Sequence, residues 1–262
     1  MSVLERNNVI VRGTGSTPIM FAHGFGCDQN MWRFVTPAFE DSHQIILFDH
    51  VGAGGSDLAA YSREKYSTLD GYAEDIIEIA RELGVTDAVF VGHSVSAMMG
   101  IIAAAKAPDI FGTLVLVGPS PSYINDGDYI GGFTRAQIDE LLESLDSNHM
   151  GWSLTMAPLI MGNPEREELG QELANSFCRT DPEIARHFAR TTFLTDCRHI
   201  LADAIIPTLI LQCSRDVIAP REVGEYVHRQ MPNSKLVVMK ATGHCPNLSA
   251  PQETVAAIKA FL

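Results

Sequence analysis

Short apolar runs recur along this chain, with helix-like segments between them. The runs occupy residues 18–22, 44–48, 88–91, 113–117, 207–213 and 235–239. Continuous apolar runs bounded by turns are typical of strands buried on both faces, so they predict an α/β fold with a mostly parallel sheet flanked by helices. The helices are expected at residues 69–83, 95–106, 221–230 and 252–262, and residues 3–12 are expected to add an antiparallel strand or two at one edge.

The alternation of strand and helix stops between residues 120 and 196. Helical segments follow one another there, at residues 136–145, 150–159, 166–177 and 182–193. Because the strand pattern resumes at residue 207, the inserted segment is predicted to be a cap over one end of the sheet. Residues 1–119 and 197–262 are therefore expected to form the core, and residues 120–196 the helical cap.

Charge and residue usage narrow the classes of function. The 262 residues carry a formal net charge of -13 without a basic cluster, which argues against a nucleic-acid partner. The first residues lack a basic start followed by an apolar run, and no segment is long enough to span a bilayer, so a cytoplasmic protein without membrane association is expected. Five cysteines and nine histidines are scattered without metal-binding spacing, so no metal is expected.

A glycine-rich loop at residues 49–56 invites comparison with dinucleotide-binding loops. The required spacing fails because position 57 is aspartate and no helix follows at once. The loop is interpreted as a structural turn, and no cofactor is expected.

Ser94 stands at the corner between a predicted strand and a predicted helix. The string Gly92-His93-Ser94-Val95-Ser96 follows the apolar run 88–91 and precedes the helical segment, as in a nucleophile elbow. Small neighbours are needed at such a tight turn, and Ser96 stands where this motif usually has glycine. A serine at this place could also merely cap the helix. Residues at the other strand ends distinguish a nucleophile from a helix cap.

Three further strand-end loops carry suitable chemistry. In an open α/β sheet, ligands bind beyond the carboxyl ends of the strands. The loop at residues 23–26 could turn the Phe25 N–H inward to form an oxyanion hole with the Val95 N–H, although an ordinary tight turn is equally compatible. Asp216 and His244 follow the last two predicted strands, in the chain order of a hydrolase triad.

At these residues the sequence resembles the serine α/β-hydrolases, and within them the subfamily of the bacterial sigma-B stress regulator RsbQ and the plant karrikin and strigolactone receptors. The resemblance covers nearly the whole chain and is carried by residues 23–29, 69–72, 90–98, 125–133 and 243–246. It implies an eight-stranded type of sheet with a four-helix cap inserted after the sixth strand. It also implies an apolar pocket above the serine, lined by Phe25, Tyr123, Phe133, Trp152, Met156, Phe193 and Ile218.

The leading functional prediction is a serine hydrolase that cleaves a small apolar ester or lactone through an acyl-enzyme on Ser94. His244 would act as the base, oriented by Asp216. The alternative is a ligand-sensing regulator, similar to a stress-response activator or butenolide receptor, in which hydrolysis is slow and a signalling protein such as a phosphatase receives the output. A perhydrolase or carbon–carbon bond hydrolase is a third possibility, whereas haloalkane dehalogenases are excluded because position 94 is not aspartate.

Overall fold

The computed structural model describes residues 1–262 and contains one seven-stranded sheet. The strands are β1 (Ile10–Arg12), β2 (Thr17–Ala22), β3 (His43–Leu47), β4 (Ala88–His93), β5 (Phe111–Val117), β6 (Thr208–Arg215) and β7 (Ser234–Thr242). They lie in the order β1-β3-β2-β4-β5-β6-β7, and all neighbouring pairs are parallel except β1 with β3. The predicted parallel sheet is confirmed.

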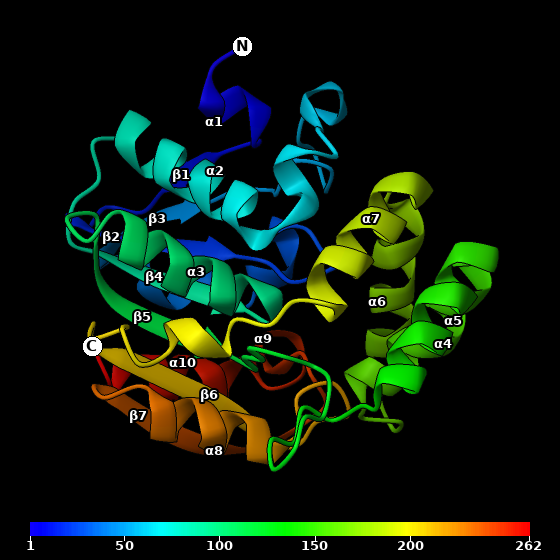
Figure 1. Cartoon of the computed structure of the whole chain (residues 1–262). Coiled ribbons are helices and arrows are strands. Elements are labelled where there is room, and N and C mark those ends of the chain that lie inside the picture. The colour runs from blue at the N-terminus through cyan, green and yellow to red at the C-terminus, as the bar shows by residue number, and fades with distance from the viewer.

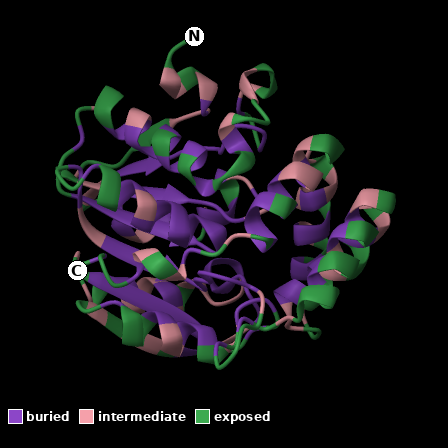
Figure 2. Cartoon of the chain, in the orientation of Figure 1, coloured by how far each residue is buried: buried purple, intermediate pink, exposed green.

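Helices cover both faces of this sheet. They are α2 (Leu69–Glu82), α3 (Val95–Lys106), α8 (Arg221–Gln230), α9 (Pro246–Ser249) and α10 (Pro251–Lys259), with short 3-10 turns η1 (Gln29–Trp32), η2 (Thr36–Phe39), η3 (Leu58–Ala60), η4 (Lys65–Ser67) and η5 (Arg198–Ile200). One cluster of 35 buried residues packs under α2, α3 and α8, and a second of 34 lies on the opposite face, so the central strands are covered on both faces. Figure 2 shows these buried residues running through the sheet and the inward sides of the helices.

The β4 strand explains why the apolar runs predicted strands so well. All six of its residues are buried, and the first six residues of β6 are buried as well. A strand that is covered on both faces needs apolar side chains at every position, which removes the alternation of an exposed strand. The central strands therefore appear in the sequence as continuous runs.

The predicted antiparallel edge strand is confirmed at Ile10–Arg12, which pairs with β3, but the residues before it differ from the prediction. Val3–Arg6 form a short helix, α1, because Ser2 accepts a hydrogen bond from the Glu5 N–H while the Glu5 carboxylate accepts one from the Ser2 N–H. Only Ile10–Arg12 join the sheet. The sheet therefore has seven strands instead of eight, and the cap follows the fifth strand instead of the sixth.

Four helices lie between β5 and β6 and form the cap. They are α4 (Arg135–Ser147), α5 (His149–Met161), α6 (Glu167–Arg179) and α7 (Pro182–Phe193). Figure 1 shows them in green and yellow-green beside the sheet, past one end of the strands. No helix of the chain combines the length and the apolar character that crossing a bilayer requires.

Candidate active site

Ser94 occupies a sharp turn between β4 and α3. Its backbone adopts φ 58° and ψ -125°, a region that residues with a side chain rarely occupy. The turn leaves no room for a larger residue at Gly92, where a Cβ atom would lie 2.5 Å from the Ser96 carbonyl oxygen. The strand and helix can approach this closely only with glycine at position 92, which is the geometry of a nucleophile elbow.

The structure brings Ser94, His244 and Asp216 into one hydrogen-bonded row. The Nε2 atom of His244 lies 2.7 Å from the Ser94 hydroxyl, and its Nδ1 atom lies 2.7 Å from Oδ2 of Asp216. The other carboxylate oxygen of Asp216 accepts hydrogen bonds from the Ile218 and Ala219 N–H groups, which hold the carboxylate in place. All three side chains are buried, so water competes little for these contacts.

Two backbone N–H groups near Ser94 are available for an incoming oxygen. Val95 begins α3 and Phe25 lies in the loop after β2, and neither N–H donates a hydrogen bond to the backbone. Buried N–H groups are almost always paired in folded proteins, so two free ones beside a serine mark a place for a ligand oxygen. Gly24 allows this close approach, since a Cβ atom there would lie 2.6 Å from Nδ1 of His93.

His93 links the nucleophile turn to the loop that carries His244. Its Nε2–H donates a hydrogen bond of 2.8 Å to the His244 carbonyl oxygen, and the two rings lie 5.0 Å apart. Burial, with the neighbouring His244 as the second cause, lowers the pKa of His93 to about 3. His93 therefore stays neutral at physiological pH.

A small cavity of about 30 Å³ lies above Ser94. Its lining is mostly apolar and comes from both the core and the cap: Phe25, Cys27, His93, Ser94, Tyr123, Ile160, Leu173, Phe177, Thr192, Phe193, Ile218, His244 and Cys245. The space holds about one water molecule, so a substrate has to displace cap side chains when it binds.

The predicted pocket residues fall into two groups. Phe25, Tyr123, Phe193 and Ile218 line the cavity over Ser94, whereas the other three, Phe133, Trp152 and Met156, line a separate groove beside α4 and α5. These three side chains do not line the cavity over Ser94, and their contact with a substrate stays a prediction. Trp152 lies one layer farther out, because its ring stacks on Phe177 at 5.6 Å and meets the edge of Phe25 at 6.2 Å.

Helix α6 supplies two lining residues that are not among the predicted ones, Leu173 and Phe177. They are four residues apart and lie on the buried face of a strongly amphipathic helix. That spacing places both on one side of the helix. The pattern was visible in the sequence, but which helix of the cap faces the serine depends on how the cap docks.

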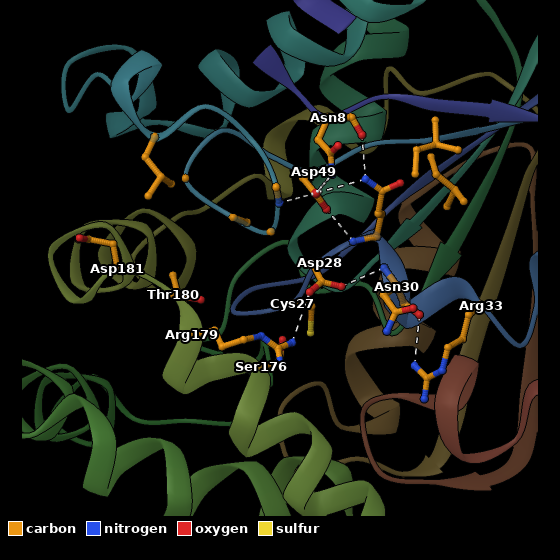
Figure 3. A pocket seen from close by; sticks show the side chains of 18 of the residues that line it. Asn8, Cys27, Asp28, Asn30, Arg33, Asp49, Ser176, Arg179, Thr180 and Asp181 are labelled. Atoms are coloured by element: carbon orange, nitrogen blue, oxygen red, sulfur yellow. Dashed lines mark hydrogen bonds and ion pairs between the residues drawn. The ribbon is translucent and has the colours of Figure 1, made fainter. Parts of the chain in front are cut away.

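A larger and more polar cleft of about 630 Å³ lies outside the catalytic cavity (Figure 3). Its floor is Asp49, whose carboxylate accepts hydrogen bonds from the Asn8 side chain and from the Gln29 and Gly55 N–H groups. These bonds fix the glycine-rich loop as a structural turn. Only Cys27 lines both this cleft and the cavity over Ser94. No three His, Cys, Asp or Glu side chains are grouped to hold a metal ion.

Comparisons with known proteins agree with this geometry. The profile of the alpha/beta hydrolase family matches residues 19–258. The karrikin insensitive 2 receptor CA of Petunia hybrida is 39% identical over 254 residues, covering 97% of this chain and 94% of the relative. The strigolactone esterase D14 of Arabidopsis thaliana is 36% identical over 253 residues, covering 96% and 94%.

A solved structure shows the same architecture at higher identity. The hydrolase from Oleispira antarctica superposes with a TM-score of 0.97 and 42% sequence identity, covering 99% of this chain and 95% of that one. The chain belongs to the α/β-hydrolase family, in the subfamily of the karrikin and strigolactone receptor-esterases, and it carries the Ser-His-Asp triad of a carboxylic ester hydrolase.

Proposed function

We propose that this protein hydrolyses a small apolar ester or lactone through an acyl-enzyme on Ser94. The observation that carries the proposal is the row of two 2.7 Å contacts from Ser94 through His244 to Asp216. A serine hydroxyl is a weak nucleophile unless a base removes its proton, and a histidine needs a carboxylate to fix its tautomer and stabilise its charged form. His244 is the base beside Ser94, and Asp216 is the carboxylate beside His244, so both requirements are met.

The reaction divides into two steps. In the first, Nε2 of His244 takes the Ser94 proton while the Ser94 oxygen attacks the acyl carbonyl, and the Phe25 and Val95 N–H groups stabilise the oxyanion. His244 then gives its proton to the leaving alkoxide, and the acyl group stays on Ser94. In the second step, water loses a proton to His244, attacks the acyl-enzyme and releases the acid, and Ser94 recovers its proton.

The lining of the cavity supports an apolar substrate with at least one additional polar atom. Most of the lining side chains are hydrophobic, but the Tyr123 and Thr192 hydroxyls are buried without hydrogen-bond partners. Burial raises the pKa of Tyr123, so its hydroxyl keeps its proton and can donate. A buried hydroxyl without a partner is unfavourable, so a ligand oxygen that reaches either one gains binding energy.

Replacement of Ser94 tests this proposal. We expect Ser94→Ala to lower kcat/KM for p-nitrophenyl acetate by at least about 10³-fold, since the loss of a single oxyanion donor already costs 10² to 10³. Ser214→Ala is the matched control because Ser214 is an exposed serine on β6, and it should keep wild-type activity. Full activity in Ser94→Ala would exclude the proposed mechanism.

A second candidate function is ligand sensing with slow hydrolysis. The observation that favours it is the small size of the cavity between core and cap, about 30 Å³, because a ligand larger than a water molecule fits there only if cap side chains move. The relatives described above are named as a receptor and an esterase. In this second function, a signalling protein such as a phosphatase would bind the cap in its ligand-bound conformation.

Hydrogen exchange can separate sensing from simple turnover. In Ser94→Ala, which binds without cleaving, a sensing role predicts that ligand changes amide exchange across α4–α7 and that the change persists while ligand is bound. If exchange in the cap is the same with and without saturating ligand, the sensing role is excluded.

A further inference from the structure

Ser96 carries a buried hydroxyl at a position where glycine is usual in a nucleophile elbow. Its Oγ lies 2.5 Å from the His23 carbonyl oxygen and 2.8 Å from Nε2 of His50. A carbonyl oxygen can only accept, so the Ser96 hydroxyl donates to His23 and accepts from the His50 Nε2–H. The hydroxyl therefore ties the first turn of α3 to the loop that follows β2.

His50 has only one protonated ring nitrogen in this arrangement. Its Nδ1 atom is buried without a partner, which fits the neutral tautomer with the proton on Nε2. Burial, with His23 as the second cause, lowers the pKa of His50 well below its usual value. Nε2 also lies 3.2 Å from the His23 carbonyl oxygen, so His50 and Ser96 both point at the same acceptor.

His23 continues the network toward Phe25. The His50 backbone N–H donates to Nε2 of His23 at 3.1 Å, which leaves the His23 proton on Nδ1. Nδ1–H then donates to the Gly24 carbonyl oxygen at 2.9 Å. The Asp49 carboxylate is 4.0 Å from Nε2, beyond hydrogen-bond distance, so it does not compete with the His50 N–H.

The Gly24 carbonyl belongs to the same peptide unit as the Phe25 N–H. A trans peptide is planar, and its carbonyl oxygen and amide hydrogen point in opposite directions. A hydrogen bond that holds the Gly24 oxygen toward His23 therefore holds the Phe25 N–H away from it. The Phe25 N–H is one of the two donors that are free beside Ser94.

We propose that Ser96, His50 and His23 are positioning residues that aim the Phe25 N–H at the reacting oxygen. The inference rests on the proposed hydrolase function. None of the three touches the substrate, since none lines the cavity over Ser94. Their effect should consequently appear in the stabilisation of the oxyanion, and leave substrate binding unchanged.

Three variants and one inhibitor test this inference. Ser96→Ala removes the hydroxyl, His23→Ala removes the ring, and His23→Asn keeps an N–H close to the position of Nδ1. The measurements are kcat and KM for p-nitrophenyl acetate and the inhibition constant of a trifluoromethyl ketone, whose adduct with a serine places an oxyanion in the hole. The matched control is Ser153→Ala, because Ser153 is also buried and also donates to a single backbone carbonyl, that of His149 at 2.8 Å.

We expect Ser96→Ala to lower kcat about tenfold with an equal loss in inhibitor affinity and an unchanged KM, which corresponds to one neutral hydrogen bond. His23→Ala should lower kcat about 10²-fold, as expected for a misdirected oxyanion donor, and His23→Asn should recover at least tenfold of that loss. Ser153→Ala should leave all three constants unchanged.

The inference is overturned if folded Ser96→Ala keeps the wild-type kcat and inhibition constant. It is also overturned if His23→Ala and His23→Asn lose activity equally while inhibitor affinity stays constant. If His23→Ala does not fold, the kcat and the inhibition constant of Ser96→Ala alone test the inference. A wild-type protein without esterase activity would overturn the proposed function and this inference together, whereas an active wild type with unaffected variants overturns the inference only.

Discussion

The residue before the nucleophile donates a hydrogen bond to the residue that acts as its base: Nε2 of His93 lies 2.8 Å from the carbonyl oxygen of His244. The backbone of the His244 loop is thereby fixed against the end of β4. The same loop is fixed from the other side, because the His244 N–H donates to the Ile160 carbonyl oxygen at the end of α5. The base is therefore held between core and cap.

The buried His93 should make the stability of the protein depend on pH. Burial lowers its pKa from 6.5 to about 3 in the folded state, so between these values the unfolded chain binds the extra proton. Stability is then present above pH 6.5 and is lost as the pH falls toward 3, by up to about 1.4 kcal/mol per pH unit for one such proton. His93→Gln should reduce this slope.

Urea unfolding at pH 7.0, 5.5 and 4.5 measures the slope. The control is His199→Gln, because His199 is an exposed histidine on η5 whose side chain remains in water in both states. Equal slopes in wild type, His93→Gln and His199→Gln would show that His93 is not the group that links stability to pH.

The Asp216 carboxylate should be needed for catalysis and not for the fold. Asp216→Asn keeps the shape but presents an amide to Nδ1 of His244, which favours the wrong tautomer, so kcat should fall about 10⁴-fold with little change in KM. Steady-state kinetics with p-nitrophenyl acetate measure the loss. Asp203→Asn, at an exposed aspartate, serves as the control. An Asp216→Asn variant within tenfold of wild type would contradict the assigned role.

The size of the cavity should set the preference for acyl length. With about 30 Å³ over Ser94, kcat/KM should fall from p-nitrophenyl acetate to butyrate to hexanoate. Phe177→Ala removes a lining ring and should raise the hexanoate-to-acetate ratio at least tenfold, whereas Phe34→Ala, at a ring that is 50% exposed, should leave it unchanged. An unchanged ratio in Phe177→Ala would show that another part of the cap limits the acyl group.

Four of the five cysteines should be unreactive in the folded protein. Cys27, Cys197, Cys213 and Cys245 are buried, and burial raises the pKa of each thiol, that of Cys27 to about 12. Only the thiolate reacts readily, so Ellman's reagent should find one fast thiol, Cys178, and five thiols in urea. Rapid reaction of two or more thiols without urea would contradict the burial of the other four.

The sequence was most informative where burial is uniform. The runs that predicted strands correspond to β2–β7, and in the central strands β4 and β6 nearly every residue is buried, which requires apolar residues on both faces. The antiparallel edge strand predicted within residues 3–12 is present at Ile10–Arg12, but residues 3–6 form a helix because of the local hydrogen bonds between Ser2 and Glu5.

In the active site, too, some features could be predicted from the sequence and others depend on packing. Ser94, Asp216 and His244 come together because strand-end loops of a parallel sheet share one edge. The predicted pocket residues Phe133, Trp152 and Met156 line the outer groove, whereas Leu173 and Phe177 on α6 line the cavity over Ser94. Which side of an amphipathic cap helix meets the core depends on how four helices pack, and no single segment encodes that.

Covalent labelling shows whether His244 activates Ser94 as a nucleophile. The protein is treated with a fluorophosphonate, which reacts with a serine only when a base activates it, and the modified peptide is identified by mass spectrometry. One adduct on Ser94 that disappears in His244→Ala is the predicted result. An adduct on another residue, or none while p-nitrophenyl acetate is still hydrolysed, would contradict the account.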